Sequence, residues 1–369
     1  MKNKLLSAMA VFSFVFVGQT KVLTVSNNVA SPGQYSDVQS ACNAASPNDT
    51  IYIHGSETSY GDVSITKPLV LIGTGVMAQK RFKFSSKISV INIGWSANNS
   101  QNGGGSKIFG LDISSLSIKE DPSSTGIKNV LIQRNKIVNL SVGYIFTNGC
   151  GDPCATSSQS SNININNNVI GSCSVYGKSI YVKNNIIGSI SGGFAKYVST
   201  LVVAHNVINY GCNLTRGSIY NNIFFSHSSN VFAGCEYTSI TRNLVIGKIN
   251  YTESDVVFGT NTGGENILNE DPMFLDANSN PTNYSYTSTG PFADYHLSAG
   301  SPAIGAGIGG VDLGIYGGDT PFFEGTSEDG RNRYFPMPAI PVILDMNIVN
   351  SSLLKSSKLK VEFKARKQD

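Results

Sequence analysis

The chain has 369 residues, of which 40% are hydrophobic, so it is long enough to bury at least one sizeable core. Only 14% of the residues are charged, against roughly 25% in a typical soluble domain, while the 38 glycines exceed the usual share of about 7%. This composition excludes a disordered chain and favours strands joined by many turns. The net charge of +3 falls to +1 without Lys2 and Lys4, which excludes a basic surface for nucleic acid.

Residues 1–20 have the pattern of a secretory signal peptide. Lys2 and Lys4 precede an apolar run from Leu5 to Val17, and small and polar residues follow it. The alternative is a membrane anchor, but about 13 apolar residues form only about 20 Å of helix, and the hydrocarbon core of a bilayer is roughly 30 Å thick. We therefore expect an exported chain with no membrane span.

A short helix and two strands are expected next in the chain. Ser36 and Gln39 have the spacing of a capping box, and one apolar helix face follows, formed by Val38, Ala41, Cys42 and Ala45. The segments Pro47–Gly55 and Ser64–Gly75 each combine turn residues with a short apolar run, which indicates strands. Such a helix is placed to cover the open end of a stack of strands and to block edge-to-edge aggregation.

A short phrase then recurs through the middle of the chain: an alternating apolar pair, two polar positions, an asparagine and a further apolar residue. The aligned asparagines are Asn135, Asn168, Asn185, Asn206, Asn222 and Asn243. After a first gap of 33 residues, the spacing varies between 16 and 21. Helical repeats need about 33 residues or more, so this spacing predicts coils of short parallel strands joined by variable turns.

The asparagines have a physical reason to recur in such coils. A side-chain amide at a corner between two strands can donate to and accept from backbone groups of neighbouring coils. A satisfied bond contributes roughly 1 kcal/mol and a buried unpaired amide costs about 1 to 3 kcal/mol, so the column is stable only when aligned. The alternative is that asparagine is simply common in turns. Six copies in one hydrophobic frame favour a buried asparagine ladder.

Residues with possible chemistry lie beside this ladder, at Arg134, Lys183, His205 and Arg242. They are candidates for the base of a lyase, and the alternative is that they are solvated turn residues. A glycoside hydrolase generally needs two carboxylates, but residues 129–250 contain only Asp152 and Glu236.

No histidine pair has ligand spacing and no Asp cluster suits calcium, so the sequence predicts neither a metal nor a cofactor. Three aromatic residues are candidates for stacking on sugar rings, although strands are rich in such residues anyway. These are Trp95, Tyr181 and Tyr220.

The six cysteines of an exported chain permit disulfides. Cys150 and Cys154, separated by three residues in a long insertion, are the expected pair. Cys173 aligns with Ile190 of the next coil, which indicates a buried apolar position. Cys173 and Cys212 are expected two coils apart, about 9.6 Å, beyond the roughly 7 Å limit for a disulfide.

The C-terminal region, residues 331–369, follows a predicted β-helix domain that covers residues 21–330. It begins with a proline-punctuated linker at Phe335–Pro341. In Lys358–Ala365, apolar and charged residues alternate, which predicts a strand with one buried face. We expect a hairpin with a basic tail, and a role of this tail in sorting or surface attachment stays open.

The opening at Tyr35–Ile53, the asparagine-centred coils and three closing segments resemble secreted bacterial proteins of the pectin-lyase-like superfamily. The closing segments are Asp271–Asp276, Tyr295–Gly307 and Asp312–Gly318. The resemblance implies an all-β fold, a single right-handed parallel β-helix with an N-terminal helical cap and a small C-terminal β appendage. It also implies a cell-exterior setting and contact with polysaccharides, but no single reaction.

Two functions are compatible with these features. The first, which we prefer, is a secreted, non-catalytic surface or matrix protein that contacts glycans or other cell-envelope components through a flat face. The second is an enzyme, a polysaccharide lyase that acts on an acidic polysaccharide by β-elimination. The sequence leaves the glycan, the partner and the oligomeric state undetermined.

Overall fold

We describe a computed structural model of the protein. It describes residues 20–75, 84–96, 101–119, 126–143, 160–193, 200–224, 231–246, 251–275 and 295–322, and the strand residues 325–326, 332–333, 342–348 and 361–366. Residues 1–19 of the predicted signal peptide and the insertion with Cys150 and Cys154 lie outside these ranges. Within the described part of the chain, no helix combines the length and apolar character needed to cross a bilayer.

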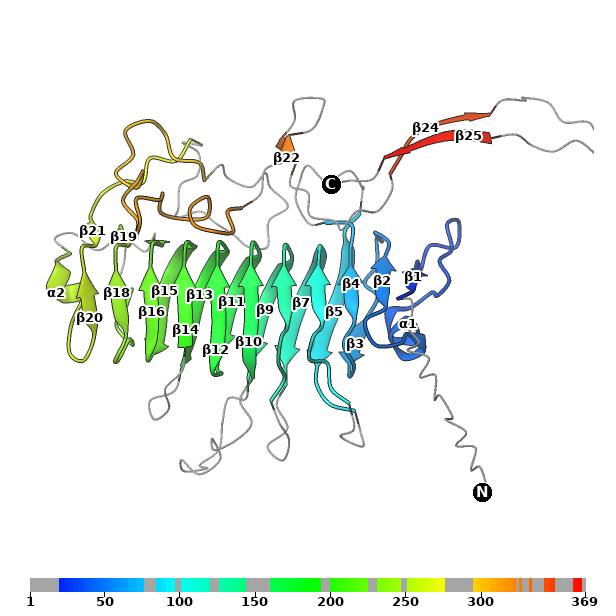
Figure 1. Ribbon diagram of the computed structural model, residues 1–369, viewed down its shortest axis with the longest axis horizontal. Coiled ribbons are helices and arrows are strands. Elements are labelled where there is room, and N and C mark those ends of the chain that lie inside the picture. Colours follow the sequence, from blue (N-terminus) through cyan, green and yellow to red (C-terminus); the bar gives the residue numbers. More distant parts are fainter. Residues whose placement is uncertain are drawn as a thin grey trace, which may run out of the picture.

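The chain winds through two long sheets in which every strand pairs in parallel with the next coil (Figure 1). Sheet A has 11 strands: β1 (Val22–Val25), β2 (Thr50–Ile53), β4 (Val70–Ile72), β6 (Lys107–Phe109), β8 (Leu131–Gln133), β10 (Ser161–Asn166), β12 (Ser179–Lys183), β14 (Thr200–Ala204), β16 (Gly217–Tyr220), β18 (Ser239–Thr241) and β20 (Thr262–Gly264). Sheet B has 10 strands: β3 (Asp62–Ile65), β5 (Ser86–Ile93), β7 (Leu111–Ile118), β9 (Lys136–Val142), β11 (Val169–Val175), β13 (Ile186–Gly193), β15 (Val207–Thr215), β17 (Ile223–Phe224), β19 (Leu244–Val245) and β21 (Ile267–Leu268). This arrangement confirms the predicted parallel β-helix.

Alternation along each strand fills the inside of the coils. In β12, Ile180 and Val182 are buried, whereas Tyr181 and Lys183 face outward. Because the coils stack in register, each inward residue lies between equivalent residues of its neighbours, as Val182 lies between Ile165 and Val203. These columns of Ile, Leu and Val form one continuous core along the stack, which excludes water at every level.

A helix covers the first coil, as the sequence predicts. Helix α1 (Val38–Ala44) buries Val38, Ala41 and Cys42. The predicted capping box is wrong, however, because Asp37 and not Ser36 is the N-cap, and its carboxylate accepts from the Ser40 backbone N–H at 2.7 Å. Gln39 instead ties the helix to sheet B, since its side chain accepts from the backbone N–H of Ser64 at 2.7 Å.

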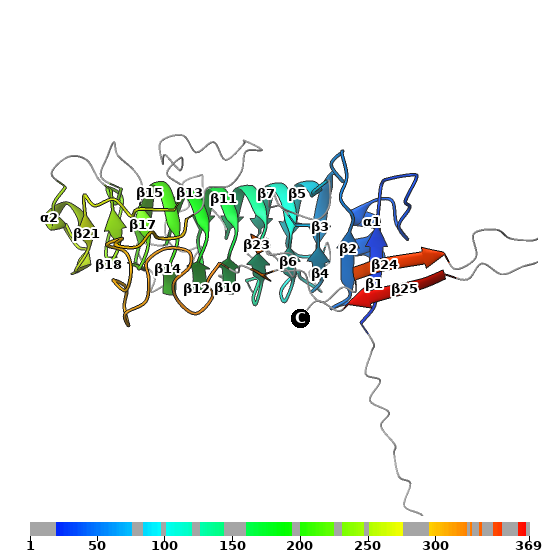
Figure 2. The ribbon, with the colours of Figure 1, turned by 90° about the horizontal axis from the view of Figure 1, so that it is seen from above.

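Residues 295–322, which we call the strap, leave the coils and turn back along them. Figures 1 and 2 show this segment, in orange, running along the outside of the later coils at the corner between the two sheets. Its contacts progress backward through the stack, from Gly307 beside Arg242 to Thr320 beside Asn167. The strap therefore covers the corner that the asparagines occupy.

The C-terminal region contains two short sheets. Strands β22 (Gly325–Thr326) and β23 (Asn332–Arg333) pair antiparallel, as do β24 (Val342–Ile348) and β25 (Val361–Arg366). The β24–β25 hairpin is the predicted C-terminal β appendage, although β25 begins three residues later than the predicted strand.

Candidate functional site

The asparagine ladder is continuous at the corner between the sheets. Each amide oxygen accepts the backbone N–H of the preceding rung at 2.8 to 3.0 Å, and each amide nitrogen donates to a carbonyl of the preceding coil. The six predicted asparagines are all fully buried. Asn266 forms a further rung that the sequence analysis missed, and its amide donates to the Glu253 carboxylate of helix α2 (Glu253–Val256) at 2.7 Å.

The residue before each rung has a left-handed backbone, with φ between 51° and 62° at Arg134, Asn167, Asn184, His205, Asn221, Arg242 and Glu265. This conformation turns the chain from sheet A into sheet B, and asparagine tolerates it better than most residues. Three of the four candidate catalytic residues belong to this column. Lys183 does not, because it is the last residue of β12 and pairs with Asn166 and Ala204 on the outer face of sheet A.

The strap binds this left-handed column through side-chain amides. Asn184 Nδ2 donates to the carbonyls of Ile315 at 2.9 Å and Gly317 at 2.7 Å. Asn221 Oδ1 accepts from the backbone N–H of Ile308 at 2.9 Å, and Asn167 Nδ2 donates to the carbonyl of Thr320 at 3.1 Å. The asparagines that precede the buried rungs thus form hydrogen bonds with backbone groups of the strap.

His205 lies beneath the strap, only 6% exposed. Its Nε2 accepts from Asn221 Nδ2 at 3.1 Å, which requires a neutral ring. A side chain at Gly318 would approach the ring to 2.7 Å, so the strap needs glycine at this position. Burial, followed by the nearby Lys183, lowers the pKa of His205 from 6.5 to about 4, although Asp319 and the Asp312 carbonyl act in the opposite direction.

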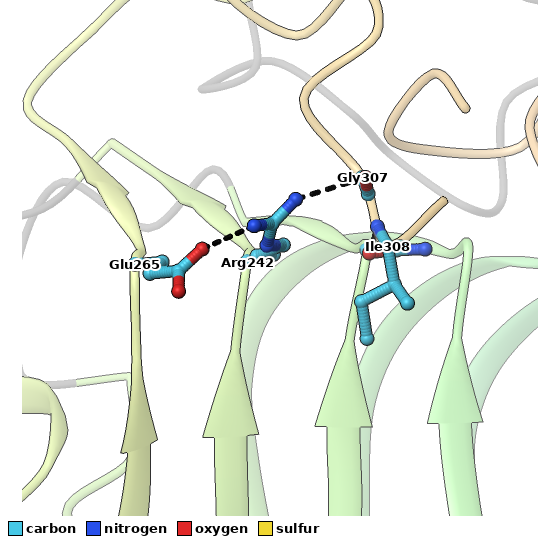
Figure 3. A network of polar contacts seen from close by, with 5 residues as sticks. Arg242, Glu265, Gly307 and Ile308 are labelled. Atoms are coloured by element: carbon cyan, nitrogen blue, oxygen red, sulfur yellow. Dashed lines mark hydrogen bonds and ion pairs between the residues drawn. The ribbon is translucent and has the colours of Figure 1, made fainter. Parts of the chain in front are cut away.

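Arg242 holds the middle of the strap, at Gly307 (Figure 3). Its guanidinium forms an ion pair with Glu265 and donates to the Gly307 carbonyl at 3.3 Å. Arg134 lies on an earlier coil than the strap contacts described, and burial lowers its pKa to about 10. Three coils separate Arg134 from His205, about 14 Å, so the two side chains cannot act on one bond.

An apolar column explains where the strap lies. The residue after each rung points outward. It is Lys136 in β9, and in the following coils it is one of six aliphatic residues, namely Val169, Ile186, Val207, Ile223, Leu244 and Ile267. Together with strap residues such as Leu313, Ile315 and Phe322, they form a second hydrophobic cluster. The strap therefore keeps this column out of water, and the candidate residues beneath it have structural contacts.

The C-terminal halves of the sheet B strands β7 to β13 present a partly exposed polar face. Its outward residues form two columns from β7 to β13, and none of them is charged: Ser115, Ser117, Asn139, Ser141, Ser172, Ser174, Ser189 and Ser191. We call these residues the serine face. The hydroxyls of Ser174 and Ser191, on successive coils, lie 3.3 Å apart. Coils stack at about 4.8 Å, so the face is a regular array of donors and acceptors.

An aromatic ring stands at one end of the serine face. In β15 the register shifts, because Ile208 and Gly211 pair with Ile187 and Ser189 across one extra residue. Tyr210 lies in this bulge and is 60% exposed. Of the aromatic residues proposed from the sequence, Tyr181 and Trp95 are half-buried, and Tyr220 packs edge-on against His205. Tyr210 was missed because a bulge is not visible in strand alternation.

The cysteines and acidic residues add no metal centre to the described part of the chain. Cys173 pairs with Ile190 as predicted, and Cys42, Cys173, Cys212 and Cys235 are free and buried. Among the residues described, no three His, Cys, Asp or Glu side chains gather closely enough to hold a metal ion.

The fold and the faces define a parallel β-helix with one strapped corner and one partly exposed polar face. Comparison of the chain with models of known protein families and with curated proteins finds no match.

Proposed function

We propose that this chain is a secreted, non-catalytic surface or matrix protein of the pectin-lyase-like superfamily that binds glycans of the cell envelope through the serine face. The observation that carries the proposal is the uncharged array of hydroxyls and amides on β7 to β13, with the exposed Tyr210 beside it. The signal-peptide pattern of residues 1–20 supports an extracellular location.

A face of this kind suits an extended glycan. Sugar hydroxyls both donate and accept, as serine hydroxyls and asparagine amides do. The apolar faces of sugar rings pack on exposed aromatic rings, and Tyr210 offers one. Each polar contact contributes only about 1 kcal/mol net. The rigid sheet presents several contacts at fixed spacing, so a polymer that meets many of them gains affinity without ordering the protein.

The absence of charge on the serine face favours a neutral glycan. Recognition of uronic acids relies on Lys and especially Arg, whose guanidinium binds a carboxylate through two hydrogen bonds. The serine face has neither residue type. Retention on a neutral polysaccharide is therefore expected to exceed retention on an acidic one of similar length.

A polysaccharide lyase is the second candidate function, and one observation favours it. Burial lowers the pKa of Arg134 to about 10, which increases the fraction of its side chain that is neutral and able to accept a proton. Against it, His205 and Arg242 contact the strap, and Lys183 lies on sheet A two coils away from Gln133, the neighbour of Arg134.

The test uses the purified chain without its predicted signal peptide, mixed with insoluble cellulose, xylan, chitin, pectate and alginate. We expect sedimentation with a neutral polysaccharide and no release of unsaturated ends that absorb in the ultraviolet. Tyr210→Ala is expected to weaken binding. Tyr237→Ala is the matched control, because Tyr237 is also exposed but stacks on Arg216 away from the serine face. Ultraviolet absorption with pectate or alginate would establish the lyase instead, and a chain without either activity would refute both candidates.

A further inference from the structure

Two of the buried thiols lie side by side inside the stack. Cys212 is an inward residue of β15, and Cys235 belongs to the coil that follows it. We propose that Cys212 and Cys235 form a disulfide when the chain folds in an oxidising compartment, so that they are a covalent modification site that ties two successive coils together.

The contacts of the Cys235 sulfur place it against the backbone of β15. Its Sγ donates to the Cys212 carbonyl at 3.3 Å and accepts from the Leu214 backbone N–H at 3.4 Å. The two thiols also interact with each other, and this interaction raises the pKa of Cys212 and lowers the pKa of Cys235. The bridge between Thr215 and Glu236 places Cys235 on the coil next to Cys212, offset by two residues along β15, and its sulfur reaches back to Cys212 across this short diagonal.

The other described thiols cannot compete for this pairing. Cys173 pairs with Ile190, which pairs with Cys212, so two strand spacings separate the two cysteines, about 9.6 Å. That distance exceeds the limit of about 7 Å for a disulfide. Cys42 lies in α1, at the opposite end of the stack from β15 (Figure 1). Geometry therefore selects one pair among the four described cysteines.

Cys212 and Cys235 lie where the long strands of sheet B end. β15 is the last strand of sheet B with a long C-terminal half. The next strand, β17, has only two residues, and the following described residues, 231–234, form a turn. Few backbone bonds tie this turn to β15, such as those from Cys212 N to Val231 O at 2.8 Å and from Glu236 N to Leu214 O at 3.0 Å. A disulfide would reinforce the stack where the ladder of strands stops.

The chemistry is an ordinary thiol–disulfide exchange. The interaction with Cys212 lowers the pKa of Cys235, whereas burial raises the pKa of Cys212, so Cys235 is the readier thiolate. Its sulfur attacks a small-molecule disulfide such as oxidised glutathione and releases one glutathione thiolate. Cys212 then attacks the mixed disulfide and releases the second. The protein gives up two protons and two electrons, and oxidised glutathione becomes two thiols.

The test is refolding of the unfolded, reduced chain in a buffer of oxidised and reduced glutathione. Free thiols are then alkylated in denaturant, and the unreduced protein is digested and mapped by mass spectrometry. We expect a linked peptide pair that contains Cys212 and Cys235, with Cys42 and Cys173 alkylated. A map in which Cys212 and Cys235 are both alkylated, or are linked to other cysteines, would overturn the proposal.

Thermal unfolding provides an independent readout. Reductant is expected to lower the melting temperature of the refolded chain by about 5 °C, in the range for loss of one disulfide from a protein of this size. Cys235→Ser should abolish that part of the response, whereas Cys173→Ser, the matched control in the same sheet, should keep it. Equal responses in the two variants would contradict the assignment. If Cys235→Ser does not fold, the peptide map of the unchanged chain still decides.

Discussion

Replacing one central rung of the ladder tests the energetics of the corner. Asn185 donates to the carbonyls of Ile165 and Lys183, both at 2.8 Å, and accepts the backbone N–H of Asn168 at 2.8 Å. Asn185→Ala removes these bonds where no water reaches, because the side chain is fully buried. The N–H of Asn168 and at least one carbonyl lose a partner. Two orphaned groups at roughly 1 to 3 kcal/mol each give an expected loss of about 4 kcal/mol.

The assay is urea unfolding, followed by far-ultraviolet circular dichroism. The free energies of unfolding of the variants are compared with the same m-value, the slope of that free energy against urea concentration. Asn164→Ala is the matched control, because Asn164 faces outward from β10 and, among the described residues, its amide bonds only to Asn162, at 3.3 Å on the surface. That control is expected to change stability by less than about 0.5 kcal/mol. A loss for Asn185→Ala below about 1 kcal/mol would refute the view that the amides form a buried, satisfied network.

Further expectations concern the strap. Because the pKa of His205 is lowered from 6.5 to about 4, the unfolded chain binds the proton first. The contribution of His205 to stability is therefore complete above pH 6.5 and is lost as the pH falls toward 4. Melting temperatures across this range should fall less for His205→Asn, and parallel curves would contradict this reasoning. Val207→Lys introduces a lysine at a strap contact, as Lys136 stands at the equivalent position of the coil without one. Limited proteolysis should then cleave residues 295–322 sooner. An unchanged cleavage rate would show that the apolar column does not hold the strap. Arg242→Gln removes a partly exposed ion pair and should lower the free energy of unfolding in urea by less than about 1 kcal/mol. A larger loss would contradict the view that this ion pair contributes little to stability.

The repeat was readable from the sequence because one chemical requirement recurs at each corner. A fully buried amide at Asn168 or Asn206 must satisfy the same backbone groups at every coil, so the residue and its apolar frame are repeated. Asn266 was missed because β20, Thr262–Gly264, lacks the inward apolar residues of the earlier strands. The requirement for an amide persists there, although the hydrophobic pattern that reveals it has ended.

The strap could not be located from local patterns, because its contacts join residues more than 60 positions apart. One signal was present nevertheless. The change from Lys136 to Val169 at the outward position after each rung marks the coil at which the corner becomes covered. The candidate catalytic residues were chosen for their chemistry, but sequence alone does not reveal that His205 lies under glycines of the strap.

The most direct test of the proposed role is a charge placed within the serine face. Ser174→Glu lies at its centre, and Ser218→Glu is the matched control on the outer face of sheet A. For the polysaccharide that retains the unaltered chain, we expect Ser174→Glu to weaken binding at least about tenfold, or about 1.4 kcal/mol, and Ser218→Glu to bind normally. Equal binding by both variants and the unaltered chain would contradict recognition through this face.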